Sequence, residues 1–233
     1  MNLAAPDLAA SAACWNCQAP VRGEHFCPAC GKVQPLPPRT DYFSLLGLPP
    51  RLALDSADLE QRFLQLSWKL HPDNFVCASE FEQNISLERS ARLNDAYRTL
   101  RDPVRRVEYV LALAGMRKEG QTKQQAPPEL LEEVFELNEA LDELRAARRT
   151  GGDARASADL RARLEGAQKH FEEKLREVDE QLAAAAREWD ALLVAQGDAA
   201  AQRRIMERMN EILNRRSYVR NLLANVQSEL AEA

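Results

Sequence analysis

The C-terminal half of the chain carries three stretches in which apolar residues recur with a helical period. The first stretch steps by four and three residues, the spacing of one helix face, at Leu130, Val134, Leu137 and Leu141. A second, longer stretch covers 160–192 and a third covers 205–230. Glycine-containing segments at 150–153 and 197–198 separate them. The pattern predicts three amphipathic helices packed as a compact antiparallel bundle.

The middle of the chain predicts four shorter helices, near 41–47, 57–70, 83–101 and 103–114. Either Asp55 or Ser56 can cap the second of these helices. Asp102 and Pro103 form a good helix start, because aspartate caps the first turn and proline is tolerated at the first helical position. Gly115 is a plausible stop for the fourth helix.

Two segments of distinct composition divide the chain. A proline-rich segment at 34–38 follows a stretch that carries four of the five cysteines, and a polar segment at 117–128 ends in two prolines. Such segments are extended and cannot continue a helix. We therefore expect an N-terminal cysteine module with its connector (1–39), a helical domain (40–116), a linker (117–127) and a C-terminal helical bundle (128–233). The predicted fold class is all-α.

Composition and charge narrow the classes of function. The 233 residues are 45% hydrophobic and 29% charged, which is typical of a protein with a real core. The net charge of -5 disfavours a chain whose main task is binding nucleic acid phosphates. No apolar run approaches the ~20 residues that a membrane span requires. Residues 1–13 contain no Lys or Arg, which argues against a secretory signal or a mitochondrial transit peptide.

The cysteine module contains two CxxC pairs separated by nine residues, Cys14–Cys17 and Cys27–Cys30. Four thiolates in this arrangement can occupy tetrahedral corners, and zinc favours four sulfur ligands in closed structural sites. The module has too few apolar residues for a core, so metal binding would supply its folding energy, on the order of 10 kcal/mol. Redox disulfides and a rubredoxin-like iron site are the alternatives. His25 lies between the pairs, and we expect it to be a surface residue rather than a ligand.

The tripeptide His71-Pro72-Asp73 follows the second predicted helix. Proline prevents helix continuation and biases the preceding residue away from helical geometry, so the tripeptide is expected in a loop. His71 and Asp73 could in principle form an acid–base pair, or the turn could have no function. Because no nucleophile, phosphate loop or ligand set accompanies them, we expect no enzyme.

Several segments together closely resemble one family. They are DYFSLLGL (41–48), the tripeptide at 71–73, LNDAYRTL (93–100), RDPVRRVEY (101–109) and PELLEEVFELNE (128–139). The combination resembles a J-domain, and specifically the HscB family of co-chaperones of iron–sulfur cluster assembly. Some members, notably mitochondrial ones, also carry paired N-terminal CxxC motifs with a different spacing. The resemblance implies a J-domain helical hairpin and a three-helix bundle, here preceded by a small zinc-ribbon-like module.

The resemblance also implies an adaptor without chemistry of its own. The turn would dock on a DnaK-type ATPase chaperone, usually the specialised HscA, and stimulate its ATP hydrolysis. The implied chaperone-binding residues are His71, Pro72 and Asp73, with Arg62 and Lys69 on the second helix. J-domains usually carry a dense basic face on that helix, and this chain does not.

The C-terminal bundle would bind the scaffold protein IscU and deliver it to the chaperone. Periodicity alone favours Leu131 and Phe135 as part of a wide core stripe. The resemblance instead implies a scaffold-binding patch formed by Leu131, Phe135, Glu136, Glu139, Glu143 and Tyr218. Glu132 stands where the family often has methionine, so the patch is smaller and more acidic.

Two other functions stay open. One is a generic J-protein serving the general DnaK chaperone, and the other is a zinc-ribbon protein that binds nucleic acid. The second is disfavoured because Arg22 and Lys32 are the only basic residues in 14–34. We expect neither a nucleic acid nor a membrane partner, and a bacterial cytoplasm or, alternatively, the mitochondrial matrix as the location. Trp68 and Trp189 are expected to pack in helical interfaces.

Overall fold

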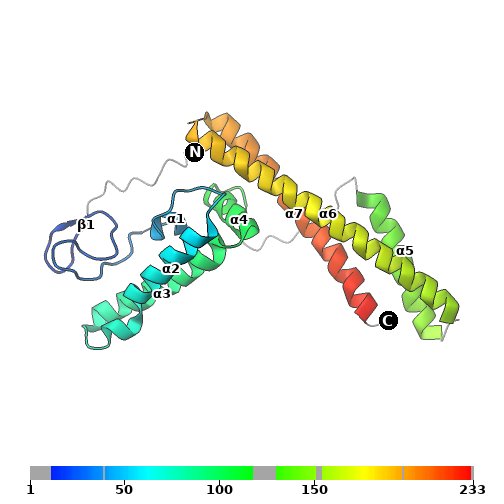
Figure 1. Cartoon of the computed structure of the whole chain (residues 1–233), viewed down its shortest axis with the longest axis horizontal. Helices are drawn as coiled ribbons and strands as arrows, with labels where there is room; N and C mark the ends of the chain where they lie inside the picture. Colours follow the sequence, from blue (N-terminus) through cyan, green and yellow to red (C-terminus); the bar gives the residue numbers. More distant parts are fainter. Residues whose placement is uncertain (1–11, 39, 118–129, 151–153, 196, 232–233) are drawn as a thin grey trace. The chain divides into compact units, whose positions relative to one another are not determined.

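The computed structural model describes residues 12–38, 40–117, 130–150, 154–195 and 197–231 (Figure 1). The chain divides into two compact units. The first contains residues 1–114 and 189–202, and the second contains 115–188 and 203–233. The predicted linker at 117–127 lies outside the described residues, apart from Arg117. The all-α class is confirmed, since the described strands are one pair of two residues each.

Residues 40–114 of the first unit form four α-helices and one 3-10 turn. They are α1 (Tyr42–Leu45), α2 (Ser56–Leu70), η1 (Pro72–Phe75), α3 (Glu80–Leu100) and α4 (Pro103–Leu113). Helices α2 and α3 lie side by side as a hairpin with η1 at its tip (Figure 1). This hairpin positions the sequence 71–73 away from the rest of the unit's core.

Side chains fix the ends of these helices. The Asp55 carboxylate accepts from the backbone N–H of Ala57, which resolves the choice between Asp55 and Ser56. The Asp102 carboxylate accepts from Val104 and Arg105, as expected. Helix α3 begins three residues earlier than predicted, because the Ser79 hydroxyl accepts from the N–H of Glu82 and caps the first turn.

The core of the first unit is apolar and aromatic. Phe63 stacks on Tyr97 with ring centroids 4.1 Å apart, and Tyr42 stacks on Tyr109 at 4.4 Å. Fully buried side chains include Phe43, Leu59, Leu70, Leu93, Leu100 and Leu111. Trp189 is 1% exposed, so the prediction that it packs in a helical interface is confirmed.

The second unit is built mainly from α5 (Leu131–Thr150), α6 (Ala154–Val194) and α7 (Ala199–Ala231). One apolar cluster draws residues from all three helices, including Leu137, Leu141, Leu164, Phe171, Val219 and Val226. The predicted periodic stripes therefore do meet in a common core. None of the helices in the described ranges has an apolar stretch that could cross a membrane.

The cysteine module belongs to the first unit. Its strands β1 (Ala12–Ala13) and β2 (Pro20–Val21) pair antiparallel, and Phe26 bridges to Val33. The backbone folds into two tight turns, one after each CxxC pair. Gln18 at φ 62 and Gly31 at φ 71 adopt left-handed backbone geometry at these turns. Gly31 does so without strain because glycine has no Cβ.

Candidate functional site

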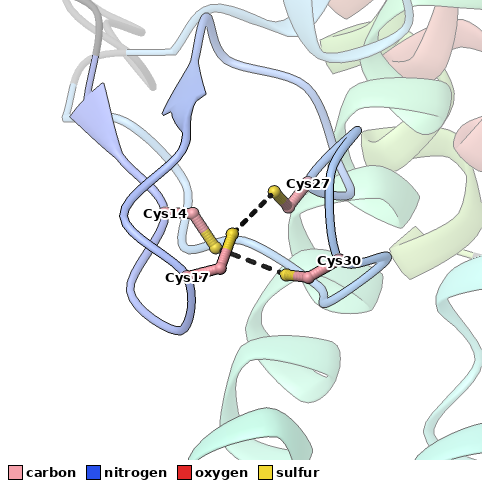
Figure 2. Close-up of side chains that lie close together, drawn as sticks. All are labelled: Cys14, Cys17, Cys27 and Cys30. Carbon is pink, nitrogen blue, oxygen red and sulfur yellow. Dashed lines mark hydrogen bonds between the residues drawn. The ribbon is translucent and has the colours of Figure 1, made fainter.

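The two turns of the module bring all four predicted cysteine ligands together (Figure 2). The Sγ atoms of Cys14 and Cys30 lie 3.7 Å apart, as do those of Cys17 and Cys27. All four sulfurs lie within 4.8 Å of one another. They form no disulfide. Sulfurs at tetrahedral corners about 2.3 Å from a zinc ion would be about 3.8 Å apart, so the cluster fits such a metal.

The surroundings of Cys14 and Cys17 shift the pKa values of these two thiols in opposite directions. Burial opposes ionisation of Cys14, but backbone N–H groups of Cys17 and Asn16 outweigh it and lower its pKa to about 6. For Cys17, the Ala19 N–H favours the thiolate, but burial and the neighbouring thiols raise its pKa to about 12. Four thiolates packed together repel one another, and a bound cation would relieve that repulsion.

The module is anchored to α3 by a buried arginine. Arg89 is 1% exposed and donates to the backbone carbonyl of Gln34 and, at 3.0 Å, to that of Pro35. Its Nη1 also lies 2.6 Å from Nδ1 of His25. Burial lowers the pKa of Arg89 to about 10, so the side chain still carries its proton and its charge at neutral pH.

His25 is therefore not the surface residue that the sequence suggested. Its ring is partly buried, with Nδ1 accepting from Arg89 and Nε2 3.1 Å from the carbonyl oxygen of Leu45. Burial and the Arg89 charge lower its pKa to about 4, so the ring is neutral at physiological pH. His25 is not part of the cysteine cluster, and it joins the module to α1 and α3 instead.

Two further contacts tie the module to the start of α3. Lys32 Nζ lies 3.0 Å from the Glu82 carboxylate, and the rings of Trp15 and Phe81 meet edge to face at 5.0 Å. Burial raises the pKa of Glu82, but hydrogen bonds from Lys32 and Ser79 outweigh it and leave the pKa below its ordinary value. The module is thus docked on α3 by charge, hydrogen bonds and one aromatic contact.

The His71-Pro72-Asp73 turn stands at the exposed tip of the α2–α3 hairpin. The side chains of His71 and Asp73 are 54% and 84% exposed. His71 Nδ1 accepts from the N–H of Asp73 at 3.3 Å and lies 3.4 Å from its carboxylate. Pro72 occupies the first turn of η1. As expected, the tripeptide is outside the α-helix and accessible to a partner.

The two predicted basic residues of α2 have different surroundings. Arg62 Nε lies 2.9 Å from the Asp58 carboxylate, and its Nη1 donates to the carbonyl of Gly47 at 2.8 Å. Arg62 therefore braces α2 against the end of α1. Lys69 is exposed and lies in the last turn of the helix.

Helix α5 presents an exposed stripe beside its buried one. Leu131 is 54% exposed and Phe135 is 71% exposed, so the wide-core interpretation suggested by periodicity is wrong. Glu136, Glu139 and Glu143 are exposed as well. Glu143 pairs with Arg163 of α6 at 3.1 Å, which ties the end of the stripe to the neighbouring helix.

Tyr218 comes from a different helix, α7, and it is partly buried. It packs against the core cluster that contains Leu137 and Val219. Because Tyr218 lies on a different helix, the periodicity of α5 gives no information about it. The structure places it at the edge of the same apolar cluster that supports α5.

The sequence analysis misjudges the burial of Trp68 and does not identify Arg89. Trp68 is 77% exposed, so the prediction that it packs in a helical interface is wrong. Arg89 was not singled out, although it is an arginine at a core position of α3 between Ser86 and Leu93, both buried. A charged residue in register with a buried helix face is the signal that would have found it.

Comparisons with known proteins agree with this architecture. No family model matches the sequence. The chain is 39% identical over 155 residues to the co-chaperone protein HscB homolog of Bordetella pertussis, covering 64% of this chain and 88% of that protein. It is 34% identical over 175 residues to the mouse iron-sulfur cluster co-chaperone protein HscB, covering 72% and 70%.

Solved structures give the same result for the fold. The crystal structure of the human co-chaperone protein HscB matches 95% of this chain and 100% of its own, with a TM-score of 0.59 and 28% identity. The chaperone HscB from Vibrio cholerae matches 83% and 99%, with a TM-score of 0.51 and 27% identity. The similarity in sequence and fold shows that this chain belongs to the HscB family of iron–sulfur cluster co-chaperones.

Proposed function

We propose that this chain stimulates ATP hydrolysis by a DnaK- or HscA-type chaperone and delivers an IscU-type scaffold protein to it. Residues 40–116 would act as the J-domain, and residues 128–233 would bind the scaffold. The observation that carries the proposal is the exposed His71-Pro72-Asp73 turn at the tip of the α2–α3 hairpin, in a member of the HscB family.

The turn has the chemistry to engage a folded ATPase. Asp73 offers a largely exposed carboxylate that can accept a charge-assisted bond from an arginine of the chaperone. His71 keeps Nε2 available as a donor or acceptor, because Nδ1 is turned toward the Asp73 backbone. Pro72 fixes the backbone between them. Stimulation requires that these contacts be stronger in the hydrolysis-competent state of the chaperone than in its resting state.

The exposed stripe of α5 supports the scaffold-binding part of the proposal. Leu131 and Phe135 supply apolar area, and Glu136, Glu139 and Glu143 surround it with negative charge. An apolar centre with a charged rim is the usual anatomy of a protein interface. The carboxylates would steer a basic partner surface into one orientation.

We propose a structural zinc ion for the cysteine cluster. Cys14, Cys17, Cys27 and Cys30 would hold it in a closed four-sulfur shell, where zinc contributes folding energy rather than a reaction. Elemental analysis should find about one zinc per chain. A metal-free protein whose residues 12–34 are folded would contradict this assignment.

The proposed partners follow the family rather than a generic J-protein, because the relatives named HscB match beyond the J-domain itself. We propose a bacterial cytoplasm as the location, with the mitochondrial matrix as the alternative, since relatives from both bacteria and mouse match the chain.

An ATPase assay with purified HscA-type chaperone tests the proposal directly. Addition of the full chain should increase hydrolysis, and addition of an IscU-type scaffold together with the chain should increase it more than the two separate effects combined. Synergy is expected only if one molecule contacts both partners. Stimulation that is unaffected by scaffold would favour the generic J-protein, and the absence of any stimulation would overturn the proposal.

A further inference from the structure

Gln34 is the first residue of the proline-rich segment that leads from the cysteine module to the helices of the first unit. It is a polar residue in a buried position, with only 3% of its surface exposed. Its side-chain nitrogen Nε2 lies 3.3 Å from the sulfur of Cys14, one of the four predicted metal ligands (Figure 2). Gln34 therefore contacts the sulfur cluster from outside it.

The surroundings of this side chain fix which of its two polar atoms faces the sulfur. The atom beside Cys14 also lies 2.8 Å from the carbonyl oxygen of Lys32 and 3.3 Å from that of Val33. Carbonyl oxygens only accept hydrogen bonds, so this atom is the donating NH₂ group and not the amide oxygen. The group has two hydrogens, and it can therefore serve the Lys32 carbonyl and the Cys14 sulfur together.

The backbone of Gln34 connects the same residue to α3. Its carbonyl oxygen accepts from the buried guanidinium of Arg89, which also donates to the carbonyl of Pro35 at 3.0 Å. Its N–H donates to the carbonyl of His25 at 3.0 Å, and the ring of His25 lies against Arg89. Gln34 thus bonds to the cluster through its side chain and to α3 through its main chain.

A donor at this position has a defined role once a metal is bound. Four thiolates around one Zn²⁺ ion leave a net negative charge, which hydrogen bonds to the sulfurs stabilise. Cys14 is 0% exposed, so the protein has to supply these bonds in place of water. The N–H of Asn16 supplies one at 3.4 Å, and Gln34 supplies the other.

We propose that Gln34 is a positioning residue for the zinc ion, which holds the Cys14 thiolate and couples zinc binding to the packing of the module on α3. This inference rests on the structural zinc of the proposed function and adds an outer residue to its four sulfurs. The coupling is reciprocal: if zinc tightens the contact between the module and α3, that contact tightens zinc binding by the same factor.

Competition with a zinc chelator measures the Kd of the full chain for zinc. Gln34→Met removes the donor, keeps a side chain of similar length and leaves the backbone carbonyl to Arg89, and it should raise the Kd by about tenfold or more. Gln34→Glu keeps the shape but places a negative charge beside the sulfur, and it should raise the Kd further. Gln61→Met, at an exposed glutamine of α2, is the matched control and should leave the Kd unchanged. Circular dichroism establishes that the helices of each variant are folded.

Cobalt(II) in place of zinc separates stabilisation of the sulfur from support of the loop. A hydrogen bond to a thiolate lowers the energy of its lone pairs. Gln34→Met should therefore move the sulfur-to-cobalt charge-transfer absorption to longer wavelength, and Gln61→Met should not. Weaker zinc binding with an unmoved absorption band would show that Gln34 only supports the loop, and it would overturn the positioning role.

Arg89→Met tests the coupling, because Arg89 bonds to Gln34 but does not belong to the sulfur cluster. Although all four cysteines are retained, the substitution should raise the Kd for zinc by at least about fivefold. Arg98→Met, at an exposed position of the same helix, is the control. Unchanged zinc binding by Arg89→Met would show that the module and α3 are not coupled, and it would overturn that part of the inference.

The outcomes separate this inference from the zinc assignment itself. If the unsubstituted chain binds about one zinc ion and Gln34→Met binds it with the same affinity, the positioning role is wrong while the zinc assignment stands. If the unsubstituted chain binds no zinc, both fail.

Discussion

Both units of the chain expose large apolar side chains, and the surroundings of these side chains differ. On α2, Leu64 and Trp68 lie in an almost uncharged face beside the His71-Pro72-Asp73 turn. On α5, Leu131 and Phe135 are flanked by exposed glutamates. Carboxylates around an apolar patch give orientation and a faster encounter with a basic partner, whereas an uncharged patch gives affinity alone. The two units are thus suited to two chemically different partners.

The units also differ in what stabilises them. The second unit has one apolar cluster shared by α5, α6 and α7. In the first unit, by contrast, the cysteine module has only a small buried cluster of its own, and contacts of Arg89, Lys32 and Trp15 dock it on α3. We therefore expect that replacing buried polar side chains by apolar ones destabilises the first unit more than the second.

The largest expected effect comes from a substitution in the His71-Pro72-Asp73 turn, which should leave the exposed stripe of α5 unaffected. His71→Gln should abolish stimulation of the chaperone ATPase, because the turn loses a group that engages the hydrolysis-competent state. Binding of the IscU-type scaffold, measured by calorimetry, should be unchanged. Leu113→Ala, at an exposed position of α4, is the control. Normal stimulation by the His71 variant would remove the J-protein interpretation.

Arg89→Met should destabilise the first unit by roughly 3 kcal/mol, because the substitution leaves buried carbonyls of Gln34 and Pro35 without a donor. Urea unfolding of the metal-loaded protein measures the change. Arg98→Met, an exposed position of the same helix, should change stability by less than about 0.5 kcal/mol. Equal effects of the two substitutions would show that the polar contacts of Arg89 contribute nothing.

The double variant Leu131→Ala with Phe135→Ala should weaken scaffold binding by about tenfold or more, since both exposed side chains lose area that the complex would bury. The unfolding free energy should stay close to that of the unsubstituted chain, because neither residue is in the described core. Calorimetry and urea unfolding give the two numbers. Stimulation of the chaperone ATPase in the absence of scaffold should be unaffected. A variant that unfolds would instead place these residues in the core.

The smallest effect concerns Glu133, which contacts Lys174 and lies 3.3 Å from His170. Burial raises the pKa of Glu133, but hydrogen bonds from Lys174 and His170 outweigh it and lower the pKa below 4.5. A lowered folded-state pKa means that its stabilising contribution is complete above 4.5 and is lost as the pH falls through the folded value. Glu133→Gln should therefore cost less than about 1 kcal/mol at pH 7 and nothing at low pH.

Urea unfolding at both pH values tests this, with Glu173→Gln as the control, because Glu173 is 66% exposed and pairs only at 3.7 Å with Arg176. A loss at low pH equal to that at pH 7 would show that the charge of Glu133 is not what stabilises the contact.

Much of the local structure could be predicted from the sequence. The caps at Asp55 and Asp102 specify where α2 and α4 begin, because a carboxylate satisfies backbone N–H groups within the same few residues. The spacing of the four cysteines likewise predicts the sulfur cluster, since each CxxC turn brings its own two sulfurs together. The capping Ser79 was missed, and α3 was therefore predicted to begin three residues too late.

Tertiary structure alone decided which helix faces are covered. Periodicity identifies residues that share a face, but whether a second element packs on that face depends on the arrangement of the whole unit. The sequence predicts that Trp68 is packed, but it is exposed, and periodicity alone favours a core position for Phe135, which is exposed too. His25 is predicted at the surface, but it is partly buried and contacts Arg89. The sequence by itself determined the helices, their ends and the metal-binding spacing, because these depend on neighbouring residues. Burial and partnership were decided by contacts between residues far apart in the chain.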